Sequence, residues 1–336
     1  MRKPLMISGA LGGAMVLAIA LVAVMVVRSG GSPSRPSQAA GFTATNSASG
    51  SAPSATASTS AKPKKSAKPS ASAKASKTGK SSSSSTHAAA TAVPSVLTVP
   101  AGYKLTFDPG FSGSTLSSTW STCYDWATST SAGCTNNPST EKEWYVPSQV
   151  QVSGGAVNLT AKQETTQGQS SSGAAQTYAC RSGMVSSKPG FSFTYGLISV
   201  TAKIPYGPGL WPALWLAATN DQWPPELDIM EHWYSEQDYK IYDHTVGTAY
   251  VGGPVPTPVN LSAGFHTYSL LWTKDRVTWY LDGVEKYTTT DHVPQQSMYF
   301  IANVADRIPD GTTSTSVAPG DCNGTMQIQS VKVWQP

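Results

Sequence analysis

The chain has 336 residues, a formal net charge of +4 and only 12% charged residues, about half the share usual for soluble globular proteins. Residues 1–100 hold eleven Lys or Arg and no Asp or Glu, so the remainder holds 23 − 11 = 12 basic and all 19 acidic residues, a net charge of −7. This negative charge argues against nucleic-acid binding by the later part, and the single long apolar run excludes a multi-span membrane protein.

The first segment, residues 1–28, has the features of a membrane anchor. An apolar run from Leu5 to Val27 follows Arg2 and Lys3 and is closed by Arg28. Its 23 residues would span about 34 Å as a helix, enough for a hydrocarbon core of about 30 Å. Because a cleavable signal has a shorter apolar core, we expect an uncleaved, single-pass signal anchor. The rest of the chain would then lie on the extracellular face of the cell membrane, or be secreted if the segment is cleaved.

Residues 29–97 are expected to form a disordered spacer. They consist mainly of Ser, Ala, Thr, Pro and Lys, and cannot bury enough apolar surface to offset chain entropy. Seven lysines fall between Lys62 and Lys80. Two interpretations remain open, a plain solvated spacer or one that also adheres to an anionic cell-wall polymer or membrane surface.

Residues 98–336 show the pattern of an all-β domain. Short runs rich in Val, Ile, Tyr, Trp and Thr alternate with period two and are divided by Gly, Pro, Ser and Asn. Asp282-Gly283 is a strong hairpin signal between two such runs. Many strands in one domain predict a two-sheet sandwich or jelly roll. The clearest strands are expected at 149–152, 156–160, 197–203, 266–272, 276–281 and 326–334.

All four cysteines lie in this domain. An even number in an oxidising compartment favours two disulfides, for which three pairings exist. We expect Cys123–Cys134 within a polar loop and Cys180–Cys322 between a middle strand and the last one. The spacing does not fit a zinc site.

Three carboxylates in one strand-like run, Glu226, Asp228 and Glu231, are the candidates for catalysis. A regular strand would place Glu226 and Asp228 on one face and Glu231 on the other. A β-bulge around Ile229-Met230 would return Glu231 to the shared face. The outer Cα atoms would then lie roughly 13 Å apart, leaving about 5–6 Å between the two Glu carboxyls, the separation of a retaining glycosidase. A polar outer face of an ordinary strand is the alternative.

The segment Glu226-Leu227-Asp228-Ile229-Met230-Glu231 resembles the bulged active-site motif of glycoside hydrolase family 16, as in laminarinase-like endo-β-glucanases. The resemblance extends over roughly residues 105–335. It also covers the runs Tyr195 to Pro205, Gly207 to Trp215, Phe265 to Trp272, Trp279 to Val284 and Val331 to Gln335.

The resemblance implies a concanavalin-like jelly roll with a concave cleft across one sheet. It implies that Glu226 is the nucleophile, Glu231 the general acid and base, and Asp228 the residue that orients the nucleophile. Neighbouring negative charge would raise the pKa of Glu231 and keep it protonated. No cofactor is implied for the reaction. Relatives carry a calcium ion on the convex face, but no ligand cluster in this sequence predicts one, so a structural calcium stays open.

Aromatic and polar residues are expected to line the sugar site. Trp215 matches a cleft-facing aromatic of the family, and Asn303 matches a sugar-contacting asparagine. Core packing is an alternative for each Trp, and a structural role is one for His244, which resembles a family histidine near the acid/base. The candidates for substrate binding are Trp215, Trp211, His244, Asn303 and Trp144.

Departures from the family pattern concern the substrate. Ser199 and Thr201 stand where many relatives have Glu and Arg, and Met184 stands where many have Arg. A 1,3- or 1,3-1,4-β-glucan is the expected substrate of a monomeric, endo-acting, retaining glycosidase, with a galactan or another wall or capsular polysaccharide still open. The alternatives are a transglycosylase of the same fold and a carbohydrate-binding wall protein without turnover.

Overall fold

The computed structural model describes residues 97–336 apart from 131, 138–140, 234, 245–249 and 307–321. The expected anchor and all but the last residue of the expected spacer lie outside the described residues. Within the part that is described, no helix has the length and apolar character needed to cross a membrane.

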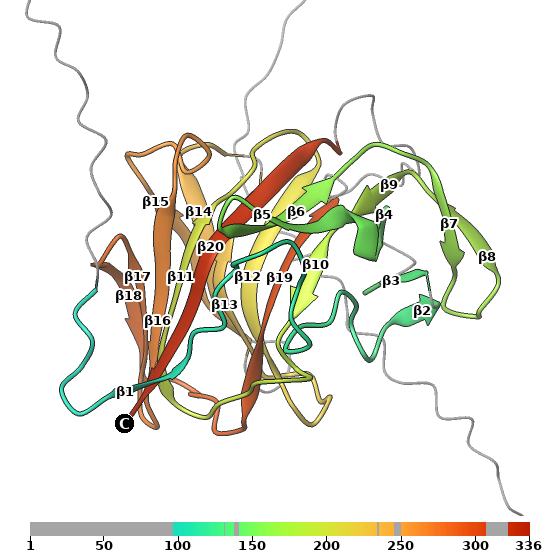
Figure 1. The fold of residues 1–336 in the computed structure, drawn as a ribbon. Coiled ribbons are helices and arrows are strands. Elements are labelled where there is room, and N and C mark those ends of the chain that lie inside the picture. The colour runs from blue at the N-terminus through green and yellow to red at the C-terminus, as the bar shows by residue number, and fades with distance from the viewer. Residues whose placement is uncertain (1–96, 131, 138–140, 234, 245–249, 307–321) are drawn as a thin grey trace, which may run out of the picture. The chain divides into compact units, whose positions relative to one another are not determined.

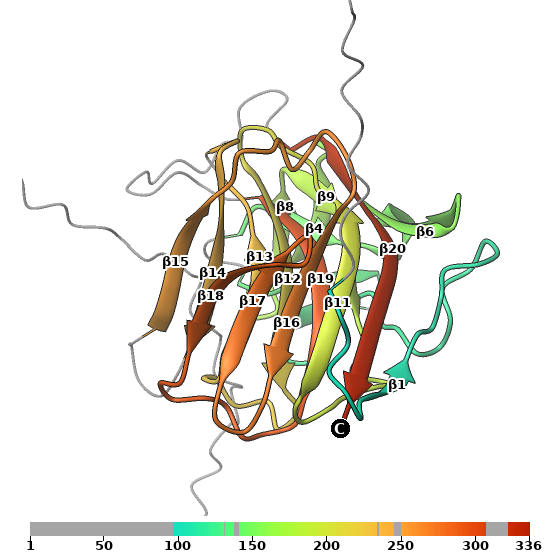
Figure 2. The ribbon, with the colours of Figure 1, turned by 90° about the vertical axis from the view of Figure 1, so that its left-hand side faces the viewer.

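Two large antiparallel sheets form the body of the domain (Figures 1 and 2). The larger sheet has eight strands, in the order β18 (Val284–Thr289), β17 (Val277–Leu281), β16 (His266–Trp272), β11 (Gly196–Lys203), β20 (Gly324–Gln335), β6 (Ala156–Ala161) and β5 (Val150–Ser153), with β1 (Lys104–Phe107) also on β20. The second has six, in the order β10 (Met184–Ser186), β19 (Met298–Asp306), β12 (Leu210–Ala218), β13 (Glu226–Glu231), β14 (Asp238–His244) and β15 (Tyr250–Pro256). The predicted all-β jelly-roll sandwich is confirmed.

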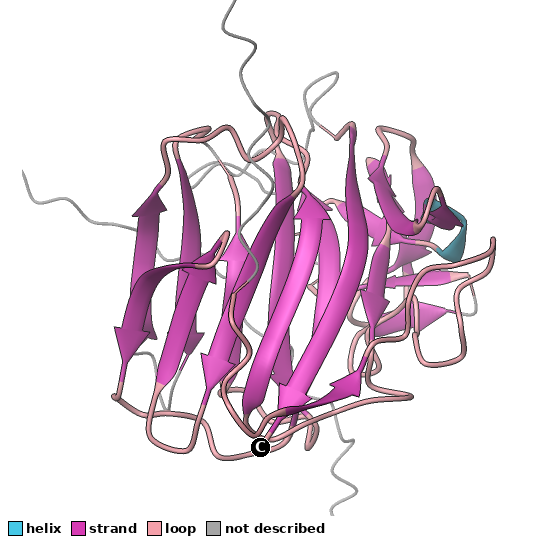
Figure 3. Cartoon of the chain, turned by 60° about the vertical axis from the view of Figure 1, so that its left-hand side comes forward, coloured by secondary structure: helices cyan, strands magenta, loops and turns pink. Residues whose placement is uncertain are grey.

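Two small sheets complete the described part. One is built from β2 (Thr128–Thr130), β3 (Gly133–Thr135), β4 (Glu143–Tyr145) and β9 (Cys180–Ser182), and the other from β7 (Thr166–Gln169) and β8 (Ala175–Tyr178). Figure 3 shows that strands dominate, with one short helical turn, η1 (Pro147–Gln149), among the described residues. The six strands expected from the sequence all form, and each observed strand end lies within three residues of the expected one.

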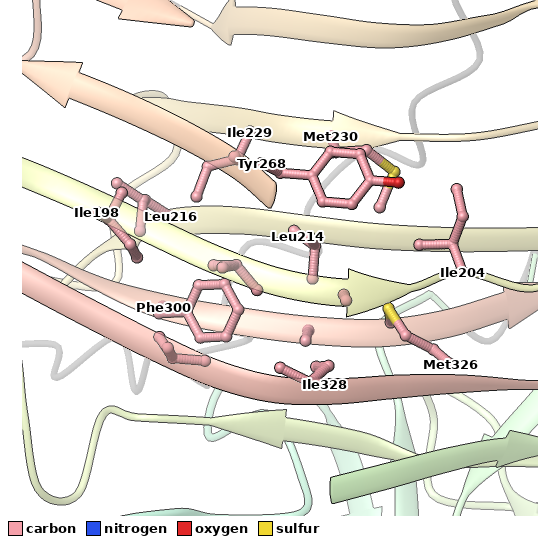
Figure 4. Packing of buried hydrophobic residues seen from close by; sticks show 14 of the residues in the cluster. Ile198, Ile204, Leu214, Leu216, Ile229, Met230, Tyr268, Phe300, Met326 and Ile328 are labelled. Atoms are coloured by element: carbon pink, nitrogen blue, oxygen red, sulfur yellow. The ribbon is translucent and has the colours of Figure 1, made fainter. Parts of the chain in front are cut away.

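The main core lies between the two large sheets. On β20, Met326, Ile328, Val331 and Val333 are buried. The register between β20 and β11 shifts at Thr201 and Ala202, and this shift keeps Met326 and Ile328 on the same inner face as Val331 and Val333. Figure 4 shows side chains of the two sheets packed together in this core. In contrast to β20, every residue of β12 and β19 is buried, so the six-stranded sheet is covered on both faces at these two strands.

The predicted hairpin and both expected disulfides are present. Asp282 and Gly283 have φ of +50° and +75°, the left-handed conformation that a two-residue turn of this kind requires. Cys123 is bonded to Cys134 and Cys180 to Cys322. The first bridge closes the loop that leads to β4, and the second ties β9 to the chain just before β20.

Candidate active site

A β-bulge in β13 brings the three carboxylates to one face. In the β12–β13 ladder, Glu226, Asp228 and Glu231 lie opposite Ala217, Trp215 and Ala213. Those β12 positions alternate and therefore share a face, so the carboxylates share it as well. The register shifts because Leu214 pairs with Met230 and Trp215 with Asp228, which leaves Ile229 as the extra residue. The predicted bulge is confirmed, and we call this side of the sheet the carboxylate face.

The other side of β13 anchors the bulge in the core. Leu227, Ile229 and Met230 all belong to the main core cluster. The carbonyl oxygen of Asp228 accepts the indole N–H of Trp279 at 2.8 Å, across the sandwich from β17. The opposite sheet therefore holds the backbone at the point where the strand departs from regular pairing.

Glu226 lies among three polar neighbours. The indole Nε1–H of Trp223 donates to Glu226 Oε2 at 2.9 Å. On β14, His244 lies opposite Glu226 in register, and its Nε2 is 3.0 Å from Asp228 Oδ2. The bond to His244 fixes the position of Asp228 next to Glu226. Trp223, which was not among the residues predicted from the sequence, also belongs to the site.

Glu231 has its own indole donor. Trp211 Nε1–H donates to Glu231 Oε1 at 2.9 Å, and the Trp211 ring packs edge-on against Trp233. Lys240 lies opposite Glu231 on β14, but its ammonium bonds Asp238 and the carbonyl oxygen of Trp233. Trp211 was expected to contact the sugar with its ring, and the structure shows in addition that its indole N–H binds the Glu231 carboxyl. Its face as a sugar contact stays a prediction.

Trp215 and Asn303 are joined to each other. The Trp215 indole donates to Asn303 Oδ1 at 2.8 Å, and Asn303 Nδ2 donates to the hydroxyl of Tyr145 at 3.0 Å. The rings of Tyr124 and Trp126, from the loop closed by Cys123–Cys134, both lie 6.1 Å from the Trp215 ring. The β12–β19 part of the carboxylate face is therefore an aromatic cluster whose ring positions are held by the disulfide loop and by Asn303.

The expectation for Trp144 is wrong. This residue of β4 is fully buried, and its ring packs against Tyr178. The backbone of Gly168 in β7 lies so close that a Cβ there would be 2.5 Å from the ring. All three residues of β4 are buried, because the strand lies between β3 and β9 and packs against β7, and Trp144 belongs to the interior of the small sheets.

Two buried titratable groups flank the carboxylates. Burial raises the pKa of Asp243, on the core side of β14, to about 7. Burial, with a further contribution from Lys240, lowers the pKa of His232, next to Glu231, to about 4. Both groups are therefore mainly neutral between about pH 4 and pH 7, Asp243 protonated and His232 deprotonated.

Three side chains of the site lie close enough together to share a metal ion. Atoms of Glu226, Asp228 and His244 lie within 4.8 Å of one another. Hydrogen bonds already account for this arrangement, since His244 bonds Asp228 and Trp223 bonds Glu226. A structural calcium on the convex face stays a prediction.

The fold agrees with the similarity of this chain to known proteins. The model of the glycosyl hydrolases family 16 matches residues 139–320, more than half of the chain. The chain belongs to this family.

Among curated relatives, the endo-1,3-1,4-beta-glycanase ExsH of Rhizobium meliloti is 28% identical over 65% of this chain and 48% of its own length. EglC of the same organism, also an endo-1,3-1,4-beta-glycanase, is 31% identical over 56% of this chain and 42% of its own length. This chain thus spans less than half of each. The solved structure of SCLam, a non-specific endo-beta-1,3(4)-glucanase, is 25% identical with a TM-score of 0.59, covering 71% of this chain and 93% of that one.

Proposed function

We propose that the protein is a retaining, endo-acting β-glycosidase that hydrolyses a 1,3- or 1,3-1,4-β-glucan outside the cell. The observation that carries the proposal is the bulge at Ile229, which sets Glu226, Asp228 and Glu231 on one face of β13. Burying a carboxylate costs free energy unless the group is paired. A strand with only a structural role would not gather three carboxylates on one buried face, whereas active sites commonly contain such groups.

In this mechanism Glu226 attacks the anomeric carbon of the sugar, and the glycosidic C–O bond breaks. Glu231 gives its proton to the departing oxygen, so the leaving sugar departs as a neutral alcohol. Glu231, now ionised, takes a proton from water, and the resulting nucleophile cleaves the ester between Glu226 and the sugar. Asp228, held by His244, keeps the Glu226 side chain in place. If a sugar hydroxyl replaces water in the second step, the same site performs transglycosylation.

The substrate assignment rests on the family and on the aromatic lining. The two Rhizobium relatives are named as 1,3-1,4-β-glycanases. Trp223 and Trp233, which are only partly buried beside the carboxylates, offer ring surface for the C–H faces of pyranose units, whereas Trp215 is 6% exposed and lies beneath Tyr124 and Trp126. Ser199 and Thr201 lie on β11 of the larger sheet, opposite Ser269 and Thr267 of β16, and not on the carboxylate face. Their departure from the family pattern therefore weighs less on the substrate than the sequence suggested.

The setting of the activity is part of the proposal. Two disulfides fit an oxidising, extracellular location. We propose a monomer held at the cell surface by residues 1–28, with the lysine-rich spacer free to contact an anionic wall polymer. Nucleic acid is not proposed as a partner.

The test is to replace each glutamate by glutamine and measure reducing ends released from laminarin, lichenan, agarose and carrageenan. Glu226→Gln and Glu231→Gln should each lower turnover by about 10²–10⁴-fold or more, while oligosaccharide binding persists. Glu236→Gln, at an exposed position five residues after Glu231, is the matched control and should retain full activity. Wild-type turnover in either catalytic variant contradicts the roles. Failure of the wild type to cleave any of the four glycans contradicts the activity.

A further inference from the structure

The two glutamates fix the direction in which a glycan crosses the sheet. Glu226 and Glu231 lie at the two ends of β13, and the proposed mechanism needs one of them on either side of the same glycosidic bond. The sugar chain therefore passes between them, across β13, and continues over the neighbouring strands. One part of the chain extends toward β12, β19 and β10, and the other part toward β14 and β15.

The carboxylate face is closed beyond β12. Tyr299 and Ile301 of β19 share this face, since they pair with β12 residues that lie opposite the carboxylates, and both are fully buried. They belong to an apolar cluster that also contains Met184 of β10, together with Tyr124 and Cys134 of the loop that a disulfide closes. Every residue of β19 and β10 is buried, so a sugar unit finds no exposed surface over these two strands.

The loop that covers this side is held in place. The Cys123–Cys134 bridge closes it, and Lys188 forms ion pairs with Asp125 of the loop and with Asp221, which follows β12. Directly after the loop, residues 135–137 donate hydrogen bonds to the buried carboxylate of Glu141. In Figure 1 the small sheets lie on the β10 side of the six-stranded sheet, and β15 forms its other edge. The disulfide loop is therefore a fixed wall at one end of the site.

The carboxylate face is open at β15. Tyr250, Gly252 and Pro254 of this strand pair with the β14 residues that lie opposite the carboxylates, and all three are exposed. Tyr250 and Tyr299 are each two strands away from Glu226 in the pairing register, on opposite sides of it. Tyr250 is 37% exposed and Tyr299 is fully buried, so the two directions differ at equivalent positions.

The Tyr250 ring is the last of a line of rings that begins beside Glu226. Trp223 donates to Glu226, its ring lies 5.9 Å from that of His244, and His244 lies 5.9 Å from Tyr250. Tyr242 packs edge-on against Tyr250 at 5.1 Å and so fixes the orientation of the exposed ring. An exposed aromatic ring held in this way suits the C–H face of a pyranose unit.

We propose that the glycan is bound asymmetrically, with Tyr250 as a sugar-binding residue at the open end and the Cys123–Cys134 loop as the wall at the closed end. Neighbouring strands lie about 4.8 Å apart, and a pyranose unit has a similar length, so the closed side holds no more than about two units while the open side holds about three. The inference rests on the proposed function. A long glycan is still cut at internal bonds, because its chain leaves the sheet at the wall and continues in solvent.

The first test measures kcat/KM on oligosaccharides of three and six units, prepared from the glycan of the panel that the wild type cleaves best. Tyr250→Ala should lose about three- to tenfold on the hexasaccharide, which reaches β15, and less than about twofold on the trisaccharide. Tyr250→Phe keeps the ring and should stay within about twofold of wild type on both. Tyr280→Ala is the matched control, because Tyr280 is a partly exposed tyrosine on the outer face of β17 in the other sheet.

The length dependence separates sugar binding from a structural effect. If Tyr250 acted only by supporting His244, its removal would slow both substrates equally, and this result overturns the inference. Unchanged turnover of the hexasaccharide by Tyr250→Ala, or equal losses in the Ala and Phe variants, overturns it as well.

The second test needs no variant, so it also decides the case if Tyr250→Ala fails to fold. Hydrolysis in ¹⁸O-labelled water followed by mass spectrometry shows which bond the wild type cuts in oligosaccharides of four to six units. Most cuts should lie one or two units from the same end at every length, because added units bind on the open side. Cuts that move to the middle as the chain grows contradict the wall. A wild type that cleaves no glycan contradicts the proposed function itself, before any variant is compared.

Discussion

Two buried groups near the site should make opposite contributions to the pH dependence of stability. Asp243 is fully buried, and neither carboxyl oxygen has a hydrogen-bond partner among the described residues. Its pKa rises from 3.8 to about 7 on folding. The folded state therefore holds a proton that the unfolded chain releases between these values, and stability falls as pH rises through this window.

His232 acts in the other direction. Its pKa falls from 6.5 to about 4 on folding, so the unfolded chain binds a proton that the folded state refuses, and stability falls as pH drops through that window. At 1.36 kcal/mol for each pKa unit, the Asp243 contribution changes by about 3 kcal/mol between pH 4.5 and 7.5, and the His232 contribution by about 2.5 kcal/mol with opposite sign. The two nearly cancel in the wild-type protein.

Substitution of one group should expose the other. Asp243→Asn cannot titrate, so its stability relative to wild type should rise by about 3 kcal/mol from pH 4.5 to 7.5. His232→Gln should fall relative to wild type by about 2.5 kcal/mol over the same range. Urea denaturation followed by tryptophan fluorescence at four pH values gives both differences, since contributions from unchanged groups cancel.

Asp275→Asn provides the control, because this side chain is 73% exposed. It should stay within about 0.5 kcal/mol of wild type at every pH. A difference between Asp243→Asn and wild type that does not change with pH would refute the reasoning, because it would mean that Asp243 is ionised in the folded protein throughout the range.

Two further predictions concern the bulge and the disulfides. Trp279→Phe removes the indole donor to the carbonyl oxygen of Asp228. It should lower the free energy of unfolding, measured by urea denaturation, by about 1–3 kcal/mol and should also reduce glycan turnover. Trp272→Phe, which removes an indole hydrogen bond to the carbonyl oxygen of Pro294, should lower the free energy of unfolding by a similar amount without loss of turnover. Removing Cys180–Cys322, which joins residues 142 apart, should destabilise by about 5 kcal/mol, against about 3 kcal/mol for Cys123–Cys134, 11 apart. Calorimetry on the two Cys→Ala pairs measures this, and the reverse order would contradict the chain-entropy argument.

The parts of the fold that could be predicted from sequence are those set by local rules. Period-two alternation identified strands such as β6 and β20, and Asp282-Gly283 marked its hairpin because few residue pairs tolerate two left-handed positions. The bulge was predictable because Glu226 and Glu231 are five positions apart, which a regular strand would place on opposite faces.

Side-chain partners were harder to predict, since they depend on which strands become neighbours. Trp144 and Trp211 have the same residue type and similar strand contexts, yet one is core and the other bonds Glu231. Trp223 gave no alternation signal because it lies in a proline-rich turn before β13. The sequence nevertheless contains one signal for it, since Trp223 stands three residues before the candidate nucleophile Glu226.

The bulge explains why the site depends on the whole sandwich and not on one strand. An extra residue interrupts the ladder that normally fixes side-chain direction, so the direction of Glu231 must be set by contacts outside β13. Trp279 supplies one from the opposite sheet, and Trp211 supplies another from the neighbouring strand. A change in the packing between the sheets should therefore alter catalysis before it unfolds the domain, because the carboxyl separation that a retaining mechanism requires tolerates little movement.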